Sequence, residues 1–122
     1  MIGGNKMPQY TKYLKFNAKT KEIIRQRDQG CIFCLMGYHA EEFDPNSMEF
    51  IQLDYAHIIP RSDLGLGIEE NGVWCCRYHH SDMDNGIKGR RQEMLEIAKD
   101  YLRGIYPDWD EEKLKYKKGM RI

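Results

Sequence analysis

The stretch Asn71-Gly-Val-Trp-Cys-Cys-Arg-Tyr-His-His80 contains a short apolar run followed by two cysteines and two histidines, and it is the strongest indication of the fold. Within it, Cys76-Arg-Tyr-His79 has the same two-residue gap as the upstream pair Cys31-Ile-Phe-Cys34. Such spacings let a tight turn direct two side chains at one ion, and zinc takes four thiolate or imidazole ligands in a tetrahedron. We therefore expect Cys31, Cys34, Cys76 and His79 to hold one structural zinc that contributes to folding.

Other roles for the cysteines stay open. The upstream pair also has the spacing of a redox motif, although no βαβ pattern surrounds it. Buried free cysteines are a further possibility, because they pack as small apolar residues. Either Cys75 or Cys76 can be the ligand. Only Cys76 has the two-residue gap to His79, whereas Cys75 continues the apolar run from Val73.

Length and composition favour one small soluble domain. The chain has 122 residues, of which 41% are hydrophobic and 31% charged. No apolar run approaches the length that spans a bilayer, and the first residues lack the apolar stretch of a signal peptide. We therefore expect a cytoplasmic protein without a membrane partner. In the reducing cytosol, four cysteines are better explained as metal ligands than as disulfides.

The charge distribution is uneven although the formal net charge is zero. Residues 6–27 carry seven basic side chains against one acid, whereas residues 41–70 carry eight acids against one base. Basic residues cluster again at 88–91 and 113–121. A neutral total can therefore hide basic surfaces that bind nucleic acid, or these charges can simply be solvated faces.

Hydrophobic periodicity predicts a mixture of helices and short strands. Asn17 or Thr20 is expected to cap the first helix, Gly30 to end it in the left-handed conformation, and Gly104 and Pro107 to stop the longest one. The expected elements are a helix at 18–29, a half-buried strand at 48–55 that 56–59 extends or pairs with, a mobile loop at 61–72, a strand at 73–75, a partly helical stretch at 76–85, a helix at 90–103 and a short helix at 110–117.

The stretch Tyr55-Ala-His-Ile-Ile-Pro-Arg-Ser62 stands between the two Cys/His pairs. The order AHIIPRS, Asn71 and CxxHH resembles the zinc-containing branch of the HNH endonuclease family over about residues 20–90. The resemblance implies an α+β fold: a ββα-metal (HNH) core with two zinc knuckles, flanked by an N-terminal helix and a longer C-terminal helix. We accordingly divide the chain into an arm (1–16), an HNH nuclease domain with structural zinc (17–104) and a basic C-terminal extension (105–122).

The resemblance implies a catalytic role for three residues. His57 takes the place of the general base that activates water, which suits an imidazole that titrates near neutral pH. Asn71 takes the place of a residue that braces the loop and orients this base; beside Gly72 it can equally be a turn residue. His80 takes the place of a ligand to the catalytic metal, while His79 closes the zinc site. Otherwise His80 caps a helix or replaces His79 at the zinc.

Ala56 departs from the family pattern, in which an Asp or His before the base is often a second catalytic-metal ligand. We expect Asp84 to replace it, because Asp84 follows His80 by four residues on one helical face. Asp54 is less favoured, since a separation of three from His57 places it on the other side of a strand; Asp82 is a further candidate. One histidine with oxygen ligands accepts Mg²⁺, Mn²⁺ or Zn²⁺.

The resemblance therefore implies a metal-dependent endonuclease that hydrolyses nucleic-acid phosphodiester bonds, DNA rather than RNA. We expect four basic residues to contact phosphates. One comes just after the predicted base, and three open the long helix, where cations oppose the macrodipole and so are not placed for helix stability. These residues are Arg61, Lys88, Arg90 and Arg91. One alternative is a catalytically inactive zinc module that binds DNA or a protein partner, which Ala56 supports; a weaker one is a thiol redox protein. His39 is expected to be an exposed polar residue, and the oligomeric state stays open.

Overall fold

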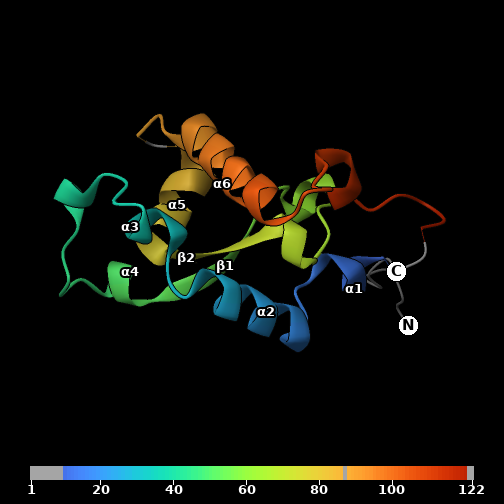
Figure 1. Ribbon diagram of the computed structural model, residues 1–122, viewed down its shortest axis with the longest axis horizontal. Helices are drawn as coiled ribbons and strands as arrows, with labels where there is room; N and C mark the ends of the chain where they lie inside the picture. Colours follow the sequence, from blue (N-terminus) through green and yellow to red (C-terminus); the bar gives the residue numbers. More distant parts are fainter. Residues whose placement is uncertain (1–9, 87, 121–122) are drawn as a thin grey trace, which may run out of the picture.

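The computed structural model describes residues 10–86 and 88–120, which form a mixed α+β structure around a two-stranded antiparallel sheet (Figure 1). The N-terminal residues 1–9 of the expected arm and Arg121 of the basic extension lie outside the described residues. The helices and strands are α1 (Thr11–Leu14), α2 (Ala18–Asp28), α3 (Ile32–Leu35), α4 (Met48–Ile51), β1 (Leu53–His57), β2 (Gly72–Cys76), α5 (Arg77–Asn85) and α6 (Arg91–Ile105). Single turns of 3₁₀ helix lie at Ala40–Glu42, Arg61–Asp63, Glu69–Asn71 and Glu111–Leu114.

The β1–β2 hairpin is the centre of the fold. Its register runs from Leu53 opposite Cys76 to His57 opposite Gly72. Helix α5 follows β2 without a break, because the Sγ of Cys76 accepts a hydrogen bond from the backbone N–H of His79 and so caps the helix. Figure 1 shows α5 and α6 on one side of the hairpin and α2 on the other.

The core lies between the hairpin and these helices. Its largest fully buried side chains include Phe33 of α3, Val73 of β2 and Met83 of α5. Helix α6 contributes Met94, Ala98 and Leu102, one turn apart and all fully buried. The apolar stripe predicted for the longest helix is therefore its packing face.

Asp28 fixes the end of α2 against the outer edge of β2. Its buried carboxylate accepts hydrogen bonds from the backbone N–H of Trp74 (2.8 Å) and the hydroxyl of Tyr101 (2.6 Å), and it pairs with Arg27 (2.6 Å). A free strand edge leaves backbone donors unpaired. Asp28 satisfies one of these donors, and its own burial is compensated by three partners.

The strand expected at 48–55 is wrong for its first four residues. Ser47 caps a helical turn there, since its Oγ accepts from the N–H of Glu49 at 3.3 Å, and Met48 and Ile51 are exposed. The apolar residues that predicted a strand at 48–51 instead belong to one helical turn. The strand begins at Leu53 and extends through His57, and its partner is β2.

The helix boundaries differ from prediction at three points. Helix α2 ends with Gln29, not Gly30, in the left-handed conformation (φ 63°). Helix α6 continues through Gly104, where a Cβ would meet open space, so tertiary packing overrides the glycine. The helix expected at 110–117 is only the 3₁₀ turn Glu111–Leu114. Beyond it the backbone pairs with the loop at 64–66, as Tyr116 N–H bonds to Leu64 O (2.8 Å).

Both flanking segments pack onto the central part of the chain. Leu14 and Leu114 are buried, and Leu66 N–H donates to Leu114 O (2.7 Å). Within residues 10–86 and 88–120, no helix is long and apolar enough to span a membrane.

Candidate metal centre and the adjoining histidine site

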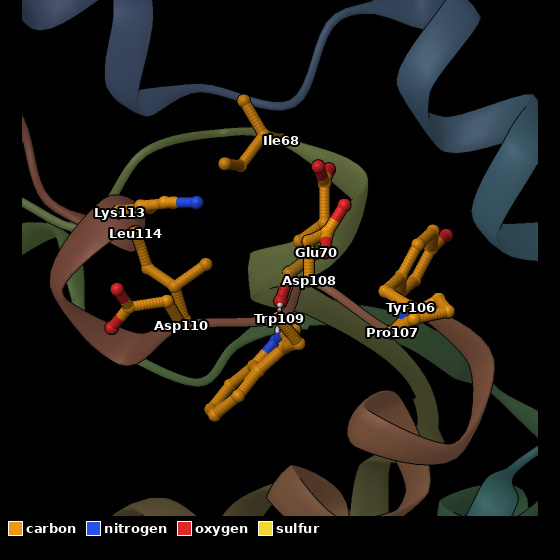
Figure 2. A pocket seen from close by; sticks show the side chains of 9 residues that line it. All are labelled: Ile68, Glu70, Tyr106, Pro107, Asp108, Trp109, Asp110, Lys113 and Leu114. Carbon is orange, nitrogen blue, oxygen red and sulfur yellow. Dashed lines mark hydrogen bonds between the residues drawn. The ribbon is translucent and has the colours of Figure 1, made fainter.

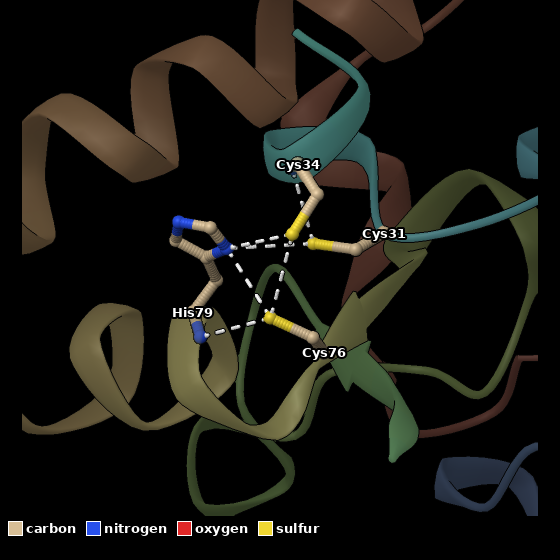
Figure 3. A group of neighbouring side chains, drawn as sticks. All are labelled: Cys31, Cys34, Cys76 and His79. Atoms are coloured by element: carbon tan, nitrogen blue, oxygen red, sulfur yellow. Dashed lines mark hydrogen bonds between the residues drawn. The ribbon is translucent and has the colours of Figure 1, made fainter. Parts of the chain in front are cut away.

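Three cysteines and one histidine converge at the junction of α3, β2 and α5 (Figure 3). Cys31 and Cys34 come from the turn of α3, Cys76 ends β2, and His79 lies in the first turn of α5. Figure 3 shows the three sulfur atoms facing the Nδ1 atom of His79. The Sγ atoms of Cys31, Cys34 and Cys76 lie 3.6, 3.5 and 3.2 Å from this nitrogen, and those of Cys34 and Cys76 lie 3.7 Å apart.

These distances fit the edges of a zinc tetrahedron. Zinc–sulfur and zinc–nitrogen bond lengths give edges of about 3.8 Å between two sulfurs and about 3.6 Å between sulfur and nitrogen. Hydrogen bonds between pairs of these side chains would not require all four sulfur and nitrogen atoms to face one common point. The cluster can therefore hold a metal ion such as zinc, with His79 coordinating through Nδ1.

The thiols are electrostatically unlike one another. A hydrogen bond from Cys76 lowers the pKa of Cys31 to about 4, whereas burial and the nearby Cys31 raise the pKa of Cys34 to about 11. Without a cation, one thiolate therefore disfavours ionisation of its neighbour; a bound divalent ion removes this penalty. Cys75 is fully buried outside the cluster and its pKa is raised by burial. Cys76, not Cys75, is thus the member of the cluster.

His57 ends β1 and is held by the segment that precedes α2. Its Nε2 lies 2.7 Å from the backbone oxygen of Leu14, and its ring stacks on that of Phe16 with 4.1 Å between centroids. Burial is the main cause that lowers the pKa of His57 below its ordinary value. This burial favours the neutral imidazole, in which one ring nitrogen is free to accept a proton.

Asn71 is fully buried and braces the loop that follows His57. Its Oδ1 accepts from the N–H of Ile59 (2.8 Å), and its Nδ2 donates to the oxygens of Ile59 (3.1 Å) and Leu66 (2.8 Å). Its own backbone oxygen accepts from Ile58 N–H (3.0 Å). Asn71 is thus a buried bracket for the chain just after His57 and not an exposed turn residue.

His80 lies between two carboxylates. Its Nδ1 is 3.1 Å from Asp54 Oδ2, and its Nε2 is 3.0 Å from Asp84 Oδ2. Asp84 and Asp54 raise the pKa of His80 through these contacts. Asp84 is therefore beside His80, as the four-residue spacing predicts. Because the two carboxylates hold opposite ring nitrogens, the three donor groups do not converge on one point in this arrangement.

Asp54 lies beside His80, although the sequence argument places it behind Asp84 among the candidate ligands of a catalytic metal. That argument compared Asp54 with His57, from which strand alternation separates it. Asp54 and Ala56 are two residues apart and so share a strand face. Asp54 thus places a carboxylate beside His80 on the strand face of Ala56. Asp82 instead pairs with Arg90 (3.4 Å) on the α6 side of α5.

His57 lines two adjoining hollows. One, of about 470 Å³, is also lined by Asp54 and by three basic residues, Lys15, Lys21 and Arg61. The other, of about 230 Å³, is also lined by Asp84 and Arg91. His57 therefore lies between the hollow that Asp54 lines and the hollow that Asp84 lines.

The other basic residues predicted to bind phosphate make contacts within the protein. Arg90 and Lys88 pair with Glu42 at 2.6 and 3.0 Å and lower its pKa to about 2. Arg91 donates to the backbone oxygens of Met83 and Asp84. These residues thus tie the end of α5 to its neighbours, whereas Arg61 is exposed beside His57.

Two other features lie apart from His57. His39, Glu41 and Glu42 form a second group of possible ligands, but Glu42 is engaged by Arg90 and Lys88. A hollow of about 330 Å³ lies at the C-terminal end, where Trp109 donates to the oxygen of Glu70 (2.8 Å). Figure 2 shows the side chains that line it: Ile68, Glu70, Tyr106, Pro107, Asp108, Trp109, Asp110, Lys113 and Leu114.

No protein-family model, curated protein or solved structure matches this chain. The function must therefore be argued from the geometry of the site. Sequence reasoning missed the contact of Leu14 and Phe16 with His57, because a backbone oxygen and a stacking ring have no signature in a motif.

Proposed function

We propose that the protein is a metal-dependent endonuclease of the HNH type, which hydrolyses nucleic-acid phosphodiester bonds with His57 as general base. The observation that carries the proposal is the place of His57. It is a half-buried histidine, whose pKa is lowered by burial, between one hollow lined by Asp54 and another lined by Asp84, the two partners of His80. The run β1–β2–α5 around this site has the order expected of a ββα-metal core.

The Cys31/Cys34/Cys76/His79 cluster is proposed to be a structural zinc site with two knuckles. It joins the turn of α3 to the start of α5, two segments more than 40 residues apart in the chain. Zinc binding there would fix the helix that bears His80. Metal binding in such sites is a part of the folding free energy, because the unfolded chain lacks the preformed ligand set.

The reaction needs a proton acceptor and charge neutralisation at the phosphate. In the proposed mechanism, the free ring nitrogen of His57 takes a proton from the attacking water. Asp54, His80 and Asp84 would hold a divalent ion, Mg²⁺, Mn²⁺ or Zn²⁺, that stabilises the negative charge developing on the phosphate and on the leaving oxygen. Because Asp54 and Asp84 contact opposite ring nitrogens of His80, their carboxylates would have to move to one side of the imidazole to share an ion with it. Asn71 holds the backbone after His57 during these changes.

The hollow beside His57 suits a phosphate backbone. Lys15, Lys21 and Arg61 are exposed along it, and Lys21 lies over the ring of Tyr55 at 5.6 Å. Cationic side chains that neutralise phosphates provide the sequence-independent part of nucleic-acid affinity. DNA is the proposed substrate, and no contact in this hollow indicates a preference for base sequence.

One observation favours a second candidate, an inactive zinc module that binds DNA or a protein. Ala56 is buried at the position where related nucleases often have a metal ligand, and the donors around His80 do not converge. Such a module would bind nucleic acid without cutting it. Its zinc site would be unchanged.

Plasmid nicking with zinc-loaded protein and added Mg²⁺ or Mn²⁺ tests the proposal. We expect nicking by the native chain and a loss of about 10²-fold or more in His57→Ala, the usual scale of general-base catalysis. His39→Ala is the matched control, because His39 lies outside both hollows. Equal nicking by His57→Ala and native protein would refute the base assignment. DNA binding without cleavage at every metal concentration would favour the inactive module.

Metal analysis separates both candidates from a thiol redox protein. We expect about one tightly bound zinc per chain, and loss of that zinc in Cys34→Ala. A metal-free protein with a reversible Cys31–Cys34 disulfide would support the redox alternative instead.

A further inference from the structure

The segment Tyr13–Phe16, here called the N-terminal strap, lies before the region that resembles the HNH family and makes close contacts with the proposed site. The backbone N–H of Gly67 donates to Tyr13 O at 2.8 Å. A Cβ on Gly67 would lie 2.1 Å from Lys15 O, and one on Gly72 would lie 2.6 Å from the Phe16 ring. Both distances are shorter than real Cβ contacts. At residue 67 the contact is with backbone, so the strap needs glycine there, whereas a Cβ at residue 72 would displace the Phe16 ring.

The strap holds the ring of His57 in two ways. The oxygen of Leu14 lies 2.7 Å from Nε2, and the Phe16 ring lies 4.1 Å from the imidazole centroid at an interplanar angle of 26°. A carbonyl oxygen only accepts hydrogen bonds, so Nε2 must carry the proton. In neutral His57 the lone pair is then on Nδ1.

We propose that the N-terminal strap is a positioning element of the active site, which fixes His57 in the Nε2–H form and leaves Nδ1 as the atom that accepts the proton of water. This role rests on the proposed nuclease function. Leu14 and Phe16 act through His57 and are not catalytic residues. Neutral imidazole in solution exchanges its proton between both nitrogens, and the strap removes this freedom before substrate binds.

The test compares two variants that disturb the strap with one that does not. Gly67→Ala displaces Lys15 O, and Phe16→Leu keeps an apolar side chain but removes the ring stack. Gly104→Ala is the matched control, since a Cβ there meets nothing within 4 Å. Each variant is prepared as the full zinc-loaded chain, and its melting temperature confirms folding. Phe16→Leu keeps the test usable if Gly67→Ala fails to fold.

The decisive readout is the ¹⁵N spectrum of labelled histidine, with the His57 signals assigned from their absence in His57→Gln. We expect one form with a protonated Nε2 in the native chain and in Gly104→Ala. In Phe16→Leu and Gly67→Ala we expect averaging of the two neutral forms. In nicking assays these two should lose kcat by about 10-fold to 100-fold at unchanged KM, a part of the general-base contribution.

Two different results would count against the two proposals. Unchanged His57 signals and kcat in both strap variants, with only a lower melting temperature, would mean that the strap is merely structural. Absence of metal-dependent cleavage by the native chain would instead refute the nuclease function, while the histidine spectrum would still report whether the strap fixes the imidazole.

Discussion

Replacement of Asn71 by alanine should be among the most destabilising changes in this chain. The side chain makes three hydrogen bonds of 2.8 to 3.1 Å, all to backbone groups of Ile59 and Leu66. Alanine would leave one N–H and two C=O groups without these partners. Ile59 and Leu66 are themselves buried at 8% and 3% exposure, so little water reaches these groups.

The magnitude follows from the number of groups that lose a partner. An unsatisfied buried polar group costs about 1–3 kcal/mol. With three groups, and with water entering part of the space left by the amide, we expect a loss of about 3–5 kcal/mol in the free energy of unfolding. This is a large fraction of the roughly 5–15 kcal/mol that stabilises a typical domain.

Urea unfolding at saturating zinc, followed by tryptophan fluorescence, measures this loss. Asn71→Asp is the informative second variant. It keeps the acceptor for Ile59 N–H but turns an oxygen toward two carbonyl oxygens, so it should cost at least as much as alanine. Asn46→Ala, at an exposed position, should change stability by less than about 0.5 kcal/mol. A loss below about 1 kcal/mol in Asn71→Ala would refute the bracket role.

Three further predictions follow from the same structure. Cys76→Ser should abolish tight zinc binding and lower the melting temperature steeply, whereas Cys75→Ser should retain the zinc in metal analysis; zinc loss in both would place Cys75 in the site. The pKa of His57 is lowered by burial, so with the divalent ion saturating at each pH the acidic limb of kcat/KM should lie below pH 6.5. The pKa of His80 is raised, so at limiting ion protons compete with it and the limb should move to higher pH; a limb at one pH under both conditions would contradict this. Asp28→Ala should cost about 3–5 kcal/mol in urea unfolding because it strands Arg27, against about 1–2 for Tyr101→Phe; equal losses would show that the ion pair contributes little.

The zinc-type cluster was predictable because its signal is local. A two-residue gap places two ligands on one tight turn, and the fold has only to bring two such turns together for four ligands to surround one ion. The structure brings together the four residues that the spacing indicates, Cys31, Cys34, Cys76 and His79. The pair His80–Asp84 was predictable for the same reason, since four residues make about one helical turn.

The strand expected at 48–55 was wrong for residues 48–51, because four residues with apolar side chains at 48, 50 and 51 fit a strand or a capped helical turn about equally well. In the structure, Ser47 caps the helical turn, with its Oγ accepting from the N–H of Glu49. The contact of Asp54 with His80 could not be predicted, for a different reason. Its closeness to His80 depends on which face of β1 the helix α5 covers, and the local pattern carries no information about that choice.

Spacings of two to four residues within one chain segment were enough to predict the Cys/His cluster, the long amphipathic helix and the contact of His80 with Asp84. The folded chain alone shows which atom holds His57, that Asp54 is the second carboxylate beside His80, and which lysines border the adjoining hollow. These contacts join residues 14 to 21 with residues 53 to 61. The antiparallel pairing of β1 with β2 then brings α5 to the same place. Such pairings are set by the packing of the whole core, which no short stretch of sequence contains.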